Sequence, residues 1–140
     1  MARLRSGHLI TVALTAGFLA VISLVLPWFD LLGKQRSSID ILSSASALDV
    51  IDGFVKVVVL AGWLLAPLLV AIAMPLAASG RHRAAAALLV PVGIVVFAAA
   101  LFGALVDDID IVWGAIFGAV FAATASVFAI MVFVASRVST

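Results

Sequence analysis

The sequence contains no cysteine and very little charge. Without cysteine the chain has no disulfide framework, no thiolate nucleophile and no cysteine-ligated metal site. Charged residues make up 11% of the 140 residues and hydrophobic residues 66%, whereas about a quarter of the residues in a soluble domain are charged. Much of the surface is therefore expected to face lipid. No basic patch typical of nucleic-acid binding is present, so nucleic acid is not an expected partner.

The hydrophobic residues form four long stretches, at residues 8–29, 54–77, 84–106 and 113–135. A helix of about 20 apolar residues crosses the roughly 30 Å hydrocarbon layer of a membrane. A membrane barrel would need alternating apolar and polar residues, and these stretches do not alternate. The sequence thus predicts an all-α integral membrane protein, a bundle of four transmembrane helices forming a single domain over residues 1–140. Residues 30–53 would form a small outer cap, including a short surface helix.

Basic and acidic residues are distributed unequally between the ends of these stretches. The two termini and the second connection carry basic residues and no acidic ones: Arg3, Arg5, Arg81, Arg83 and Arg137. Lys34, Arg36 and Lys56 lie in or next to the first connection and dilute this pattern without reversing it. All seven acidic residues are aspartates of the first and third connections: Asp30, Asp40, Asp49, Asp52, Asp107, Asp108 and Asp110. Because cytoplasmic loops carry an excess of Lys and Arg, both termini and the turn at residues 79–83 are predicted to face the cytoplasm.

The fourth stretch carries small residues at every fourth position: Gly114, Gly118, Ala122 and Ser126. Helices in a bilayer associate through close contact of such residues, since lipid tails are as apolar as leucine. The row is therefore predicted to be a helix-packing surface. It either closes the protein's own bundle, which we favour, or binds a helix of another protein.

The third connection places Asp107, Asp108 and Asp110 close together. Three carboxylates could bind a hard divalent cation, but a cation loop commonly supplies more ligands. A solvated acidic loop is the simpler interpretation, and contact with a basic partner on the outer face is the third. Lys56 follows Asp52 by one helical turn, so the two can pair while the long lysine stem reaches the headgroups.

Aromatic residues and prolines add two weaker expectations. Trp28 and Trp113 are expected at the outer interface, where tryptophans form belts. Three prolines interrupt the second and third stretches and are expected to bend their helices: Pro67, Pro75 and Pro91.

Catalytic chemistry is not expected. Both histidines, His8 and His82, belong to the predicted cytoplasmic side, whereas every aspartate belongs to the other side, and a Ser–His–Asp relay needs direct hydrogen bonds. The sequence also lacks the HExxH, P-loop and dinucleotide-binding motifs. The protein is therefore predicted to be no enzyme, with no catalytic residue, no cofactor and no metal site.

Short motifs along most of the chain resemble a group of small four-span membrane proteins of actinobacteria. They are Leu26-Pro27-Trp28, the Gly33 segment with Ser38-Ile39-Asp40-Ile41-Leu42, and Asp52-Gly53. In architecture the chain is similar to the four-helix accessory subunit of mycobacterial Mce lipid-import complexes. The resemblance implies a multi-pass protein of the bacterial inner (plasma) membrane that contacts membrane lipids and other integral membrane subunits, and stabilises or regulates a lipid transporter. The alternative is a self-assembled small transporter or pore.

Overall fold

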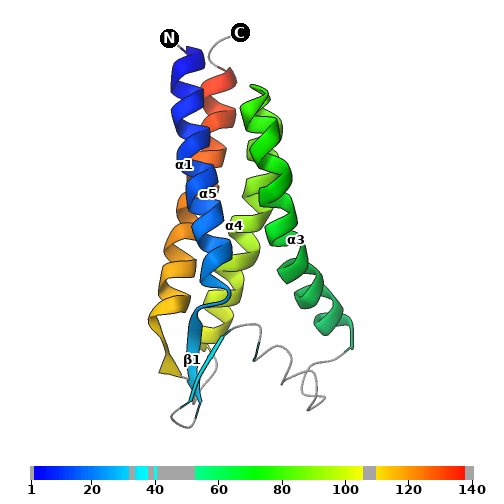
Figure 1. Ribbon diagram of the computed structural model, residues 1–140, viewed down its shortest axis with the longest axis vertical. Helices are drawn as coiled ribbons and strands as arrows, with labels where there is room; N and C mark the ends of the chain where they lie inside the picture. The colour runs from blue at the N-terminus through cyan, green and yellow to red at the C-terminus, as the bar shows by residue number, and fades with distance from the viewer. Residues whose placement is uncertain (1, 32–33, 38–39, 41–52, 106–109, 138–140) are drawn as a thin grey trace.

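The computed structural model contains four long helices and a small sheet (Figure 1). It describes residues 2–31, 34–37, 40, 53–105 and 110–137. The helices are α1 (Ala2–Ser23), α3 (Gly53–Ala78), α4 (His82–Leu105) and α5 (Trp113–Arg137). All four are long and apolar enough to cross a membrane, which confirms the predicted number and order of the long apolar helices.

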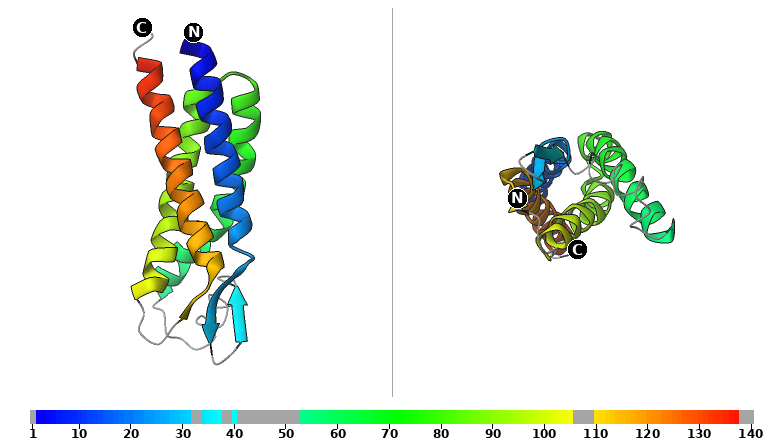
Figure 2. Two further views of the ribbon diagram at one scale, coloured as in Figure 1. Left: turned by 90° about the vertical axis from the view of Figure 1, so that its left-hand side faces the viewer. Right: turned by 90° about the horizontal axis from the view of Figure 1, so that it is seen from below.

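The helices run roughly side by side and place both chain ends at the same end of the bundle (Figure 1). Helix α1 packs most extensively on α5, and α5 packs on α4. Helix α3 packs on α4 and less extensively on α1. Seen along the bundle, α3 stands apart from the other helices over part of its length (Figure 2).

Small residues line the contacts between α1, α4 and α5. The fully or almost fully buried alanines in these helices are Ala13, Ala16, Ala20, Ala85, Ala86, Ala115, Ala122, Ala125 and Ala129. Large apolar side chains such as Leu68, Phe97 and Ile116 lie on the outside instead. This arrangement, small residues inside and large ones outside, is the one that membrane helices use to approach one another closely.

Helix α1 ends at Ser23, six residues before the apolar stretch ends at Phe29. The prediction of helix up to residue 29 is therefore wrong at this end. Pro27 explains the difference, because proline disfavours helical geometry in the residue before it. The last turn tightens, with Leu24 and Leu26 donating backbone hydrogen bonds to carbonyls three residues earlier, at 3.1 Å in both cases.

After α1 the chain forms a strand rather than more helix. Strand β1 (Pro27–Leu31) pairs antiparallel with β2 (Lys34–Ser37) on one edge and with β3 (Asp110–Ile111) on the other. This sheet joins the first and third connections, and the sequence analysis did not predict it. The expected surface helix of the cap falls on residues 41–52, outside the described residues.

Candidate functional site

The row of small residues on α5 lies against the protein's own chain. Gly114, Gly118 and Ala122 are buried, and Ser126 is half-buried. A Cβ at Gly118 would lie 2.6 Å from Ser23 Oγ and 2.9 Å from Trp28 Cζ2. A Cβ at Gly114 would overlap the carbonyl oxygen of Pro27. Glycine at these positions allows α5 to approach the end of α1 and the start of β1.

The C-terminal half of the same row meets α4. A Cβ at Gly93 would overlap Ser126 Oγ and lie 2.5 Å from the carbonyl oxygen of Ala122. Ser126 Oγ also donates a hydrogen bond to the carbonyl oxygen of Val90, at 3.4 Å. The row therefore contacts α1, β1 and α4 in turn, and little of it is left on the surface of this chain.

Trp28 fills the space where α1, β1, α3 and α5 meet. Its side chain is 1% exposed, its Nε1–H donates to the carbonyl oxygen of Ser23 at 2.5 Å, and its ring packs edge-on against Trp63 with centroids 5.5 Å apart. Trp28 thus lies at the expected end of the bundle but is buried instead of facing lipid. Trp113 at the start of α5 is largely exposed, as a belt residue would be.

The three prolines lie on the outer surfaces of their helices. Pro67 and Pro75 in α3 and Pro91 in α4 are all exposed, and both helices continue through them. None of the three faces the buried contacts between helices.

Two of the acidic residues proposed for the outer face, Asp107 and Asp108, lie outside the described residues. Asp110 belongs to β3, where its backbone is paired opposite Asp30 of β1. The sheet thus brings together acidic residues that are 80 positions apart in the chain. The predicted pairing of Lys56 with Asp52 also cannot be followed, because Asp52 is outside the described residues.

Asp40 belongs to a short hydrogen-bonded turn at the end of β2. Its carboxylate accepts hydrogen bonds from the Ser37 hydroxyl at 2.8 Å and the Ser37 backbone N–H at 3.3 Å. The Asp40 N–H returns a bond to Ser37 Oγ at 3.2 Å. This reciprocal pair has the geometry of a helix-capping box. The hydrogen bonds from Ser37, together with the charge of Arg36, hold the pKa of Asp40 below its ordinary value of 3.8.

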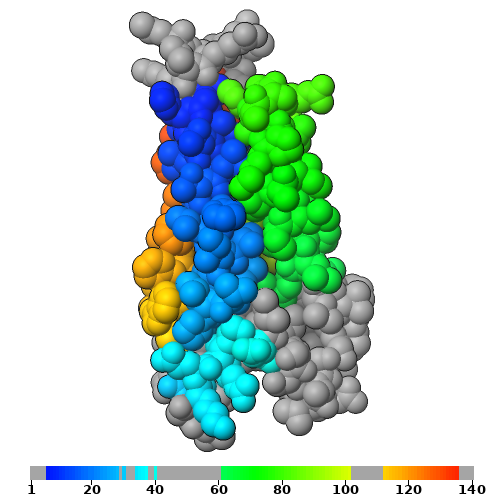
Figure 3. Space-filling model, in the orientation of Figure 1, coloured from blue at the N-terminus to red at the C-terminus, as the bar shows by residue number. Residues whose placement is uncertain are grey.

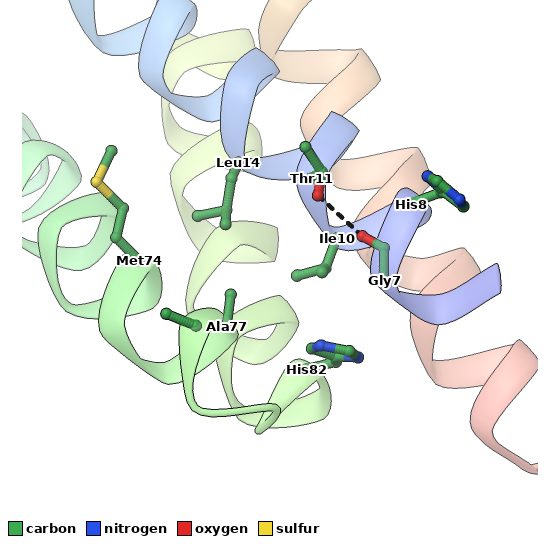
Figure 4. A pocket seen from close by; sticks show the side chains of 9 residues that line it. Gly7, His8, Ile10, Thr11, Leu14, Met74, Ala77 and His82 are labelled. Carbon is green, nitrogen blue, oxygen red and sulfur yellow. Dashed lines mark hydrogen bonds between the residues drawn. The ribbon is translucent and has the colours of Figure 1, made fainter. Parts of the chain in front are cut away.

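A pocket of about 490 Å³ opens at the end of the bundle that carries both termini. Five residues of α1, three of α3 and one of α4 line it: Gly7, His8, Ile10, Thr11, Leu14, Met74, Ala77, Ala78 and His82. His82 closes one end, with Nδ1 3.1 Å from Ser6 Oγ of α1 (Figure 4). Sequence analysis placed both histidines at this end but did not find the pocket, because it is formed only when three helices come together.

The described residues include no group of three or more His, Asp or Glu side chains that could hold a metal ion. They also leave no buried side-chain nitrogen or oxygen without a hydrogen-bond partner. Comparison with protein families, with curated proteins and with solved structures finds no match.

Proposed function

We propose that this chain is a non-enzymatic accessory subunit of a larger membrane complex. It would lie in the bacterial inner membrane, with both termini on the cytoplasmic side, and stabilise or regulate a lipid transporter of the Mce type. The observation that carries the proposal is the exposure of α3. The resemblance in the sequence supplies the transporter class.

Of the four helices, α3 has the smallest share of buried residues within its candidate membrane span. Within Ala61–Ala78, 17% of the residues are buried inside the chain, compared with 39% within His82–Leu101 of α4. Leu64, at 73% exposure, and Leu68 lie on its open side. On the face shown in Figure 3, the coloured part of α3 lies along one flank of the molecule. A helix with so little support from its own chain gives a partner's transmembrane helix a long apolar surface.

Glycines that let membrane helices approach closely are used inside the bundle, at Gly93, Gly114 and Gly118. A partner on α3 would therefore pack mainly on exposed large side chains, including Leu64, Leu65 and Ile72. A pore lined by bent helices has less support, since Pro67, Pro75 and Pro91 lie on the outside of their helices.

Photo-crosslinking from α3 tests this proposal. A photoreactive phenylalanine analogue would replace Leu68 on the exposed side of α3, and in a second strain would replace Val127, which is exposed to a similar degree on α5. After illumination of native membranes and mild detergent extraction, we expect the Leu68 variant to form a covalent adduct with a larger membrane protein. The Val127 variant should give mainly lipid adducts.

Mass spectrometry of the adduct would identify the partner. A permease subunit of a lipid transporter would support the full proposal. Another membrane protein would support an accessory role but not the transporter class. If the chain is extracted alone from native membranes and Leu68 forms only lipid adducts, the proposal is wrong.

A further inference from the structure

The pocket between α1, α3 and α4 is divided into an apolar part and a polar end. Ile10, only 3% exposed, Leu14 and Met74 form the apolar part. Gly7 and His82 form the polar end, beside the ends of α1 and α4 (Figure 4). The volume of about 490 Å³ lies within the roughly 300–1,000 Å³ typical of small-ligand sites.

The polar end and the apolar part of the pocket lie in the same order as the headgroup and the acyl chain of a lipid in a membrane. Leu14 follows Gly7 by seven positions, a rise of about 10 Å along α1, so the apolar part extends from the end of the bundle toward its middle. A lipid has its polar group at the membrane surface and its acyl chain directed inward. An amphiphile can therefore place its chain beside Ile10 and Leu14 while its headgroup stays near His82.

His82 is held in a definite position by Ser6, whose Oγ lies 3.1 Å from Nδ1. When the Ser6 hydroxyl donates to Nδ1, the proton of the neutral imidazole is on Nε2. Nε2 is then a hydrogen-bond donor, which suits an anionic oxygen. Thr11 is less suited to bind an anionic oxygen, because its hydroxyl already donates to the carbonyl oxygen of Gly7 at 2.9 Å.

The charges at this end of the bundle also favour an anion. Arg81 and Arg83 flank His82 in the chain, and both are exposed. The described aspartates, Asp30, Asp40 and Asp110, all belong to the opposite end with the sheet (Figure 1). Phosphate groups are commonly bound by such clusters of basic side chains.

We propose that this pocket binds an anionic phospholipid, with one acyl chain against Ile10 and Leu14 and the phosphate beside His82, Arg81 and Arg83. This binding goes beyond the proposed function and is a property of the isolated chain. It therefore stands or falls independently of whether α3 binds a partner subunit.

Native mass spectrometry of the purified full-length protein tests the site. The protein, in a neutral detergent, would be titrated with phosphatidylglycerol and separately with phosphatidylcholine of the same acyl chains. We expect phosphatidylglycerol to bind at least about tenfold more tightly. Both lipids carry the phosphate, but the choline ammonium cancels its charge and is repelled by the arginines. Equal retention of the two lipids would overturn the proposal.

Five variants locate the binding. Ala78→Trp fills the pocket at an exposed position and should abolish selective retention, whereas Ala98→Trp, exposed on α4 away from the pocket, should not. His82→Ala should weaken binding about tenfold, and His82→Gln should recover part of it by restoring an N–H donor. Lys34→Ala removes an exposed basic side chain at the other end and should leave binding unchanged.

Competition experiments distinguish a bound phospholipid from bound inorganic phosphate or a fatty acid. Excess inorganic phosphate should not displace phosphatidylglycerol, because the acyl chain contributes to binding. Displacement by inorganic phosphate, or retention of a fatty acid as strong as that of the phospholipid, would show that the site does not recognise a phospholipid. Each variant should elute from size exclusion and unfold as the unaltered protein does, and unchanged lipid retention in a folded Ala78→Trp protein would also overturn the proposal.

Discussion

Gly118 determines how closely α5 approaches the end of α1. Ser23 and Trp28 occupy the space in front of it, and both are held by hydrogen bonds: Ser23 Oγ donates to the carbonyl oxygen of Ala20 at 2.6 Å, and Trp28 Nε1 donates to that of Ser23 at 2.5 Å. Neither side chain can move aside without losing a buried hydrogen bond. The position therefore requires glycine for reasons of space.

The substitution Gly118→Ala is expected to destabilise the protein. Alanine raises helix propensity by about 1 kcal/mol over glycine, but a Cβ at 2.6 Å from Ser23 Oγ overpacks the site, which commonly costs about 1–3 kcal/mol. Thermal unfolding in detergent should show a lower Tm, and Gly118→Leu should prevent folding. Gly62→Ala is the control, because its Cβ would meet only the end of the partly exposed Val95 side chain, at 3.0 Å. A Gly118→Leu protein that folds but leaves its complex would instead place an external helix on this row.

The surroundings of Asp40 lower the pKa of its carboxyl group. Since its folded-state pKa is below 3.8, the ionised carboxylate stabilises the turn at Ser37 above pH 3.8, and this contribution is lost as the pH falls through the lowered pKa. Carbon NMR of the Asp40 carboxyl should give a midpoint below 3.8. Ser37→Ala should raise that midpoint, since it removes the first of its hydrogen bonds. A midpoint unaffected by Ser37→Ala would contradict the assignment.

At the scale of the elements, the contact between α4 and α5 depends on two backbones lying close together. Gly93 faces the carbonyl oxygen of Ala122 and the side chain of Ser126. Ser126 adds a hydrogen bond to Val90, and such interhelical bonds contribute on average about 0.6 kcal/mol in membrane proteins. The close approach thus matters more to this contact than the hydrogen bond does.

A double-mutant cycle on Gly93 and Ser126 tests whether the close approach of the helices contributes more to stability than the hydrogen bond. Gly93→Ala should cost about 1–3 kcal/mol through overpacking, and Ser126→Ala alone about 0.6 kcal/mol. The double variant should have a higher free energy of unfolding than Gly93→Ala alone. In the double variant the new methyl group at position 93 no longer meets the serine hydroxyl but still meets the Ala122 carbonyl. Reversible unfolding in mixed micelles gives the free energies. Strictly additive effects would show that the two residues do not contact each other.

For the whole molecule, the sheet is the feature that ties the two connections at one end together. Strand β1 follows α1, and β3 precedes α5, so their pairing joins the sheet ends of the helices that pack most extensively on each other. The backbone N–H of Val112 adds a bond to the carbonyl oxygen of Trp28 at 2.8 Å. At the end with the termini, the described connection is the short turn between α3 and α4, where Gly80 adopts a φ of 77°.

The absence of native cysteine allows the orientation to be measured with single introduced cysteines. Gln35→Cys at the sheet end and Ser79→Cys at the other end both replace exposed residues. On intact cells, a maleimide that cannot cross the membrane should label Gln35→Cys and not Ser79→Cys. Membrane disruption should make both reactive. The opposite pattern would invert the predicted topology.

The sequence by itself determined the number and order of the long helices, though not where α1 ends, because stretches of about 20 apolar residues, the length of a membrane crossing, are local in the chain. It also predicted the row at Gly114 and Gly118 as a packing surface, since its spacing repeats along one helix. Only the tertiary structure decided what that row meets, why Trp28 is buried, and that residues 27–31 pair with 110–111. It also created the pocket of Ile10 and His82. These features join residues far apart in the chain, and no local pattern records such a contact.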